Sequence, residues 1–144
     1  MRLWIDRLFL IALTVIIGLL TVTALPVLAG GHLEGTMLLL HMFASGALVF
    51  ALPAFALVYL WRNLSRVSSG VMQRWGFWLL ILSGLVTIGT VFMAMLPVPS
   101  TPQMHDLLDV HGYAGFAMVP AVVLLLLGAT RWRRIQSERS ATPG

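Results

Sequence analysis

The sequence predicts an all-α membrane protein, a bundle of four transmembrane helices with up-down-up-down topology. Hydrophobic residues make up 59% of the 144-residue chain and charged residues only 10%, whereas a soluble domain carries about 25% charged residues. The apolar residues fall into four long runs, at 8–29, 36–61, 75–96 and 107–130. About 20 apolar residues are enough to cross a membrane as a helix. Because lipid cannot satisfy backbone polar groups, each run is expected to be helical.

The expected elements follow the runs in order. We expect one domain at 1–135 and a polar cytoplasmic tail at 136–144, with helices at about 4–29, 35–61, 74–96 and 102–131. The first run follows Arg2 and Arg7 and ends at the cleavable-looking segment 27–29. It is longer than a signal-peptide core, so we expect a retained helix. Thr101 and Pro102 predict a helix cap with proline in the first turn. The connections are short, so neighbouring helices should be antiparallel.

Arginine distribution predicts the orientation. The segments 30–35 and 97–106 carry no arginine, whereas the two ends of the chain and segment 62–74 carry all nine basic residues. The positive-inside rule therefore places both termini in the cytoplasm. All the basic residues flank apolar runs, so the net charge of +4 indicates topology and not nucleic-acid binding. The chain has no cysteine, which excludes disulfides, iron–sulfur clusters and covalently attached c-type haem.

Two histidines, His41 and His111, lie inside apolar runs, where polar groups are costly and tend to be functional. Their helices are expected to run in the same direction, so both imidazoles reach a similar depth near the non-cytoplasmic face. One axial ligand from each helix would suit the iron of a haem b. Structural histidines are one alternative, since imidazoles hydrogen-bond between transmembrane helices. A zinc or copper site is the other, because neutral imidazole also binds these metals.

Small residues surround both histidines, as a large flat porphyrin requires of the helices beside it. Gly115 lies one turn from His111 on the same helical face. The small residues singled out are Ser45, Gly46 and Gly115, with Gly84 and Gly89 on the third run.

The remaining histidines lie outside the apolar runs and do not complete a second haem site. His32 and His41 are nine residues apart, which puts them on opposite faces of a helix at about 100° per residue. His105 and His111 are six residues apart, about 240° around the helix. We expect a titratable rim that serves proton exchange or partner contact, with ordinary loop polarity as the alternative. The rim comprises His32, Glu34, His105, Asp106 and Asp109.

Two of the runs resemble helices of the bacterial cytochrome b-561 family, four-helix membrane cytochromes that bind two b haems. The stretch LLLHMFASG is similar to the family's helix in which glycine follows a ligand histidine after five residues, and it matches at His41 and Gly46. The stretch VHGYAG is similar to the family's His-x-x-x-Gly helix and matches at His111 and Gly115. The resemblance therefore implies one haem with His41 and His111 as its axial ligands.

The first run, IDRLFLIALTVIIGLL, resembles the family's opening Arg-Leu-x-His helix in its arginine but lacks the histidine. The ligand positions of the family's cytoplasmic-side haem are occupied here by Phe9 or Leu10 and by Leu125. None of these side chains can bind iron. We therefore expect no second haem.

A bis-histidine haem near the non-cytoplasmic face implies local electron transfer. Its expected partners are quinone or quinol, or a neighbouring subunit, on one side and a periplasmic or membrane-bound redox protein such as a cytochrome c on the other. We expect a subunit of a respiratory or photosynthetic oxidoreductase complex in preference to a stand-alone enzyme. One alternative is a haem-free structural subunit of a larger complex. Another is metal handling by histidine and methionine, since five methionines cluster toward the same side: Met37, Met42, Met93, Met95 and Met104.

Overall fold

The computed structural model describes the backbone of residues 2–28, 30–64 and 70–141, and the side chains of 7–28, 30–60 and 70–131. Within these ranges the chain is helical and has no β-strand. The four helices are α1 (Arg2–Leu28), α2 (Gly35–Leu64), α3 (Val71–Met95) and α4 (Thr101–Ala141). All four are long and apolar enough to cross a membrane. The predicted all-α fold of four helices, each able to span a membrane, is confirmed.

The helix bounds depart from the prediction mainly at α4. This helix was expected to end near residue 131, ahead of a polar tail, but it continues to Ala141. The reason is local, because segment 131–141 contains neither proline nor glycine, and arginine, glutamine and glutamate favour helix even in water. The predicted tail is therefore helical from 136 to 141, and its last three residues lie outside the described part.

The start of α4 is capped one residue earlier than predicted. The side-chain oxygen of Gln103 accepts a hydrogen bond from the backbone N–H of Ser100 at 2.8 Å, and the N–H of Met104 donates to the Ser100 carbonyl at 2.9 Å. The bond from the N–H of Ser100 to Gln103 is one of the two hydrogen bonds of a capping box, in which the side chain at N3 accepts from the backbone N–H of the N-cap residue. Ser100 and not Thr101 therefore takes the cap position, with Pro102 in the first turn.

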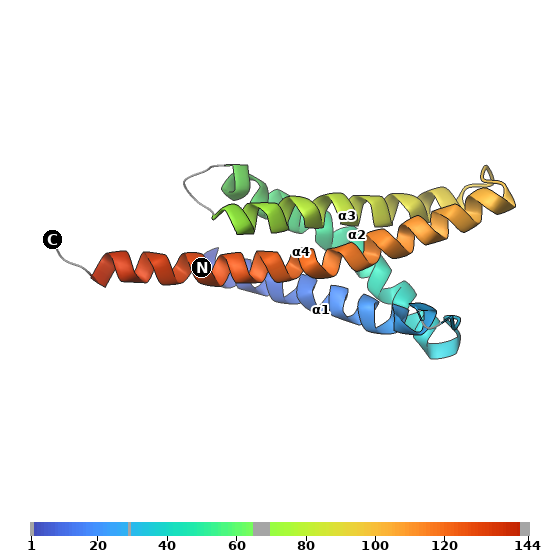
Figure 1. Cartoon of the computed structure of the whole chain (residues 1–144), viewed down its shortest axis with the longest axis horizontal. Helices are drawn as coiled ribbons and strands as arrows, with labels where there is room; N and C mark the ends of the chain where they lie inside the picture. The colour runs from blue at the N-terminus through green and yellow to red at the C-terminus, as the bar shows by residue number, and fades with distance from the viewer. Residues whose placement is uncertain (1, 29, 65–69, 142–144) are drawn as a thin grey trace.

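The helices form two hairpins (Figure 1). α1 packs mainly on α2 and α3 mainly on α4, with smaller contacts between α1 and α4 and between α2 and α3. Two glycines let α3 and α4 approach closely, because a Cβ on Gly76 would lie 2.5 Å from the Leu125 nitrogen and one on Gly128 2.5 Å from the Gln73 nitrogen. This close packing lies at the end where α3 begins.

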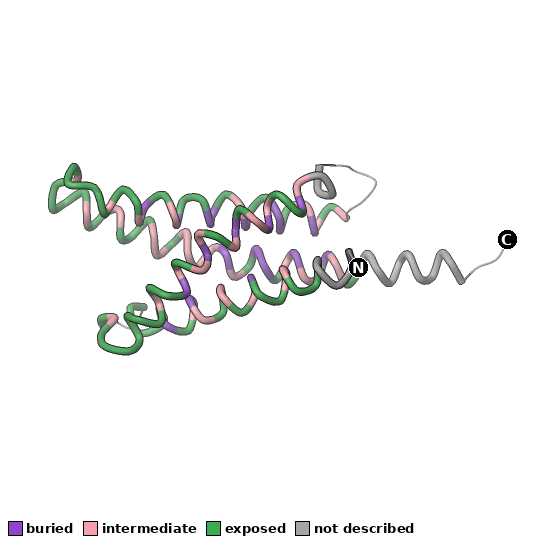
Figure 2. The backbone as a smooth tube through the Cα atoms, turned by 180° about the vertical axis from the view of Figure 1, so that it is seen from behind, coloured by how far each residue is buried: buried purple, intermediate pink, exposed green. Residues whose placement is uncertain are grey.

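At the opposite end, which carries the loops from α1 to α2 and from α3 to α4, the hairpins spread apart, as both views show (Figures 1 and 2). In the described ranges no Cα atom of α2 comes within 8 Å of one in α4. The buried residues lie mostly in the middle of the bundle and toward the close-packed end (Figure 2). The backbones of α2 and α4 are therefore held apart by α1 and α3.

Candidate functional site

A cavity of about 490 Å³ lies between the two hairpins in the half of the molecule where they spread apart. All four helices line it, and most of its wall is apolar. Its size falls within the range of about 300–1,000 Å³ typical of small-molecule and cofactor sites. The polar residues in its wall are Thr21, His41, Ser45, Thr87 and His111.

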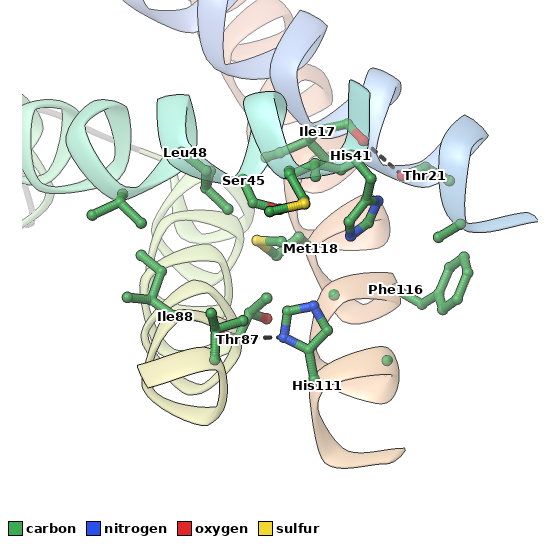
Figure 3. A pocket seen from close by; sticks show the side chains of 18 of the residues that line it. Ile17, Thr21, His41, Ser45, Leu48, Thr87, Ile88, His111, Phe116 and Met118 are labelled. Atoms are coloured by element: carbon green, nitrogen blue, oxygen red, sulfur yellow. Dashed lines mark hydrogen bonds between the residues drawn. The ribbon is translucent and has the colours of Figure 1, made fainter. Parts of the chain in front are cut away.

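His41 and His111 face each other across this cavity (Figure 3). Their ring centres are 6.4 Å apart and their planes are inclined by 69°. His41 belongs to α2 and His111 to α4. No Cα atom of one of these helices lies within 8 Å of a Cα atom of the other in the described ranges. The rings therefore project into the cavity from α2 on one side and from α4 on the other.

The Nδ1 atom of His41 is held by a threonine of α1. Thr23 Oγ1 lies 2.9 Å from Nδ1 and also 2.8 Å from the Leu19 carbonyl and 3.0 Å from the Leu20 carbonyl. A hydroxyl has one hydrogen, and in a helix it is normally donated to such a carbonyl. Thr23 must then accept from Nδ1. We assign the hydrogen of neutral His41 to Nδ1, which leaves the lone pair on Nε2.

Hydrogen bonding to α3 assigns the same tautomer to His111. Its Nδ1 lies 3.1 Å from the backbone carbonyl of Thr87 and 3.3 Å from Oγ1 of Thr90. A carbonyl oxygen can only accept a hydrogen bond, so the hydrogen is on Nδ1. In both histidines the Nε2 lone pair therefore faces the cavity. The Nδ1 atom of each ring is hydrogen-bonded to a neighbouring helix. Histidines that bind a metal are oriented in this way, through a hydrogen bond from the other ring nitrogen.

The glycines divide into two kinds. A Cβ added to Gly46, Gly112 or Gly115 would meet no atom within 4 Å, and all three line the cavity. They widen the cavity and do not bring helices together. Gly84, expected beside the porphyrin, instead packs against Leu52, whose Cδ2 would lie 2.5 Å from an added Cβ.

Gly89, the other glycine expected on the third helix, also borders open space but is exposed and is not part of the cavity wall. Ser45, Gly46 and Gly115 do line the cavity together with the two histidines. The third helix therefore contributes threonine and larger apolar side chains to the wall, and no glycine.

The residues of the predicted rim are all exposed, and none lines the cavity. His32 and Glu34 lie on the loop before α2, whereas His105, Asp106 and Asp109 lie on the first turns of α4. These two tips stand apart in both views (Figures 1 and 2). In the described ranges no group of three or more histidine or acidic residues comes together as a metal site. The rim thus consists of two separate groups of side chains.

The positions at which the family's second haem takes its ligands belong to the packed part of the bundle. Leu125 is 1% exposed in the core, and Phe9 and Leu10 pack against that core. The Leu125 nitrogen also forms the close α3–α4 contact at Gly76. The expectation of a single haem stays a prediction.

The sequence analysis missed the threonines that orient the two rings, Thr23, Thr87 and Thr90. The sequence could have indicated them, because threonine hydroxyls are among the few groups inside a membrane that can hydrogen-bond to a histidine. Their pairing with particular histidines depends on how α1 meets α2 and α3 meets α4, which spacing along the chain does not give.

The chain matches no family model, no curated protein and no solved structure. Its likeness to the cytochrome b-561 family therefore stays a prediction. The function is argued below from the geometry of the cavity itself.

Proposed function

We propose that this chain is a membrane b-type cytochrome that holds one haem between His41 and His111. The observation that carries the proposal is the pair of imidazoles facing each other across an apolar cavity, with ring centres 6.4 Å apart and each Nδ1 hydrogen-bonded to another helix. Both free Nε2 lone pairs are then available to one iron.

The ring separation fits that role. With a metal–nitrogen bond of about 2 Å and about 1.1 Å from nitrogen to ring centre, two imidazoles on opposite sides of one metal have centres about 6 Å apart. Two imidazoles joined by a direct hydrogen bond of about 3 Å would have centres about 5 Å apart. The observed separation is close to the first arrangement.

The tautomers also favour haem over purely structural histidines. Two Nε2 acceptors that face each other cannot hydrogen-bond to one another, because neither carries a hydrogen. One iron between them would use both lone pairs. A zinc site usually takes three or four protein ligands, whereas the described residues offer two here.

The residues around the rings would hold and shield the group. His41 and His111 would supply the axial bonds, Thr23 and the Thr87 carbonyl keep their rings oriented, and Gly46 and Gly115 leave room for a flat macrocycle. The apolar wall would surround the macrocycle with low-polarity side chains. A bis-histidine haem has both axial positions filled and so transfers single electrons in preference to binding oxygen.

The proposed topology places this electron transfer at the periplasmic side of a bacterial inner membrane. The arginine distribution puts both termini in the cytoplasm and gives an up-down-up-down bundle. The cavity then lies in the half nearer the periplasm. We propose exchange between quinone or quinol, or a neighbouring subunit of an oxidoreductase complex, and a periplasmic or membrane-bound redox protein such as a cytochrome c. The exposed rim side chains at the two tips would meet that partner or take up protons.

An absorption spectrum of the purified full chain tests the proposal. We expect sharp reduced α and Soret bands of a low-spin b haem, lost in His41→Ala and in His111→Ala. His32→Ala and His105→Ala are matched controls, since both side chains are exposed outside the cavity, and they should keep the bands. A protein without these bands, prepared with haem supplied, would favour the haem-free structural subunit or a colourless metal site.

A further inference from the structure

A second cavity lies on the first two turns of α3, at the end of the bundle away from the histidines. Its volume is about 260 Å³, and its lining residues are Val71, Arg74, Trp75 and Trp78. They are spaced at i, i+3, i+4 and i+7, which brings them onto one face of the helix. Trp75 is 70% exposed, whereas Gln73 and Phe77 on another face are buried. The cavity therefore opens away from the packed interior.

Among the described residues in the wall of this cavity, Arg74 is the only charged one. Its Nε atom is shielded from solvent and has no hydrogen-bond partner in the described part of the chain. A shielded N–H of a charged group costs free energy unless an acceptor reaches it. Among the acidic residues whose side chains are described, Glu34, Asp106 and Asp109 all belong to the opposite end of the helices. Within the described part of the chain, the wall of this cavity thus holds a guanidinium whose Nε makes no hydrogen bond.

The neighbouring residues indicate which acceptor fits. A guanidinium binds phosphate oxygens with a planar fork of N–H donors, and tryptophan favours the headgroup level of a membrane. Further along the same face of α3, Leu82 is 59% exposed and Leu85 55% exposed. A molecule that combines an anionic phosphate with long apolar chains would bury both parts of this surface. A free phosphate would leave the leucines uncovered.

We propose that Arg74, Trp75 and Trp78 bind the headgroup phosphate of an anionic phospholipid, whose acyl chains lie along Leu82 and Leu85. The site is independent of the proposed haem, because no residue of its wall also lines the large cavity. Its occupant would place phosphate oxygens against the guanidinium of Arg74 and fix the height of α3 in the membrane.

Native mass spectrometry of the full chain in detergent, titrated with phosphatidylglycerol or phosphatidylcholine, tests the site. We expect tighter binding of phosphatidylglycerol and about a fivefold loss of its affinity in Arg74→Gln, the change typical of one basic residue near a lipid surface. Arg131→Gln is the matched control, since it removes the same charge from an exposed residue of α4 and should change the affinity less than twofold. Equal binding of the two lipids, or an unchanged Arg74→Gln, would overturn the proposal.

A competition experiment separates a lipid site from a small-anion site. Millimolar inorganic phosphate should not displace the bound lipid, because phosphate alone covers none of the apolar surface; displacement would overturn the lipid assignment. If Arg74→Gln does not fold, Trp78→Leu provides a second variant, which keeps the charge and removes one indole. It should also weaken phosphatidylglycerol binding, and a Trp78→Leu protein that binds this lipid like the wild type would contradict the proposal.

Discussion

Thr23 on α1 lies 2.9 Å from Nδ1 of His41 on α2, and the threonine is itself 1% exposed in the core. The hydroxyl donates to carbonyls of its own helix and so serves as an acceptor for the imidazole. One buried side chain thus couples the packing of α1 on α2 to the tautomer and orientation of a proposed ligand.

Replacing Thr23 by valine should therefore weaken haem binding without unfolding the chain. Valine keeps the volume but removes the acceptor, so that His41 loses its anchor, and loss of such an outer partner typically costs about 10–100-fold in metal affinity. Haem titration of the apoprotein measures the effect. Thr23→Ser should restore most of the affinity.

Thr21→Val is the control for that experiment. Thr21 also lines the cavity, but its hydroxyl donates a hydrogen bond to the Ile17 carbonyl at 2.7 Å and bonds to neither His41 nor His111. An equal loss in Thr21→Val would show that the cavity's polarity matters and that the Thr23–His41 bond does not.

Gly115→Leu should abolish haem binding while leaving the helices intact. A Cβ at this position meets no atom within 4 Å, so the larger side chain can enter the cavity without displacing a helix and would occupy the space proposed for the macrocycle. Absorption spectra report the haem, and far-ultraviolet circular dichroism reports the fold.

Gly89→Leu is the matched control, because that glycine also borders open space but lies outside the cavity wall. It should keep the spectrum of the wild type. A Gly115→Leu protein with a normal haem content would mean that the macrocycle does not lie against Gly115.

The sequence predicted the helices and several residues of the cavity wall, but it did not predict what each glycine packs against. The four helices and the cavity residues His41, Ser45, Gly46 and Gly115 followed from hydropathy and from histidines inside apolar runs, because lipid penalises polar groups strongly enough to mark them. The roles of individual glycines did not follow. Gly84 and Gly89 look alike in the sequence, and only the positions of neighbouring helices show that one packs against Leu52 and the other against nothing.

Gly76→Ala should lower thermal stability and leave the haem spectrum unchanged. The added Cβ would lie 2.5 Å from the Leu125 nitrogen and 2.9 Å from the Ala121 oxygen, so α3 and α4 would have to separate; overpacking of this kind costs about 1–3 kcal/mol. The Tm of the detergent-solubilised protein measures the loss. Gly18→Ala, where an added Cβ meets nothing within 4 Å, should not lower it.

We expect one haem per chain. Phe9, Leu10 and Leu125 cannot bind iron, and Leu125 belongs to the packed core, so a second macrocycle at these positions would have to displace packed side chains. The pyridine haemochrome assay, together with quantitative amino-acid analysis, gives the ratio of haem to protein. A ratio near two would contradict both the ligand assignment and the interpretation of the packing.

The two tips of the bundle should contribute separately to docking of a redox partner. Acidic side chains steer basic partners, and this steering weakens with salt because the screening length is about 8 Å at physiological ionic strength. Glu34 stands on one tip and Asp106 and Asp109 on the other. A partner that bridges the tips would respond to both groups, whereas one that docks on α4 alone would respond only to the second.

We expect the α4 tip to dominate, because its two carboxylates lie on the helix that carries His111. Asp106→Asn with Asp109→Asn should slow haem oxidation by a basic cytochrome c and flatten its dependence on salt, and Glu34→Gln should do so less. Stopped-flow spectroscopy at several ionic strengths measures both effects. Unchanged rates and salt response in the triple variant would remove the tips from the docking surface, and lateral exchange with quinone or a neighbouring subunit would then be the better account.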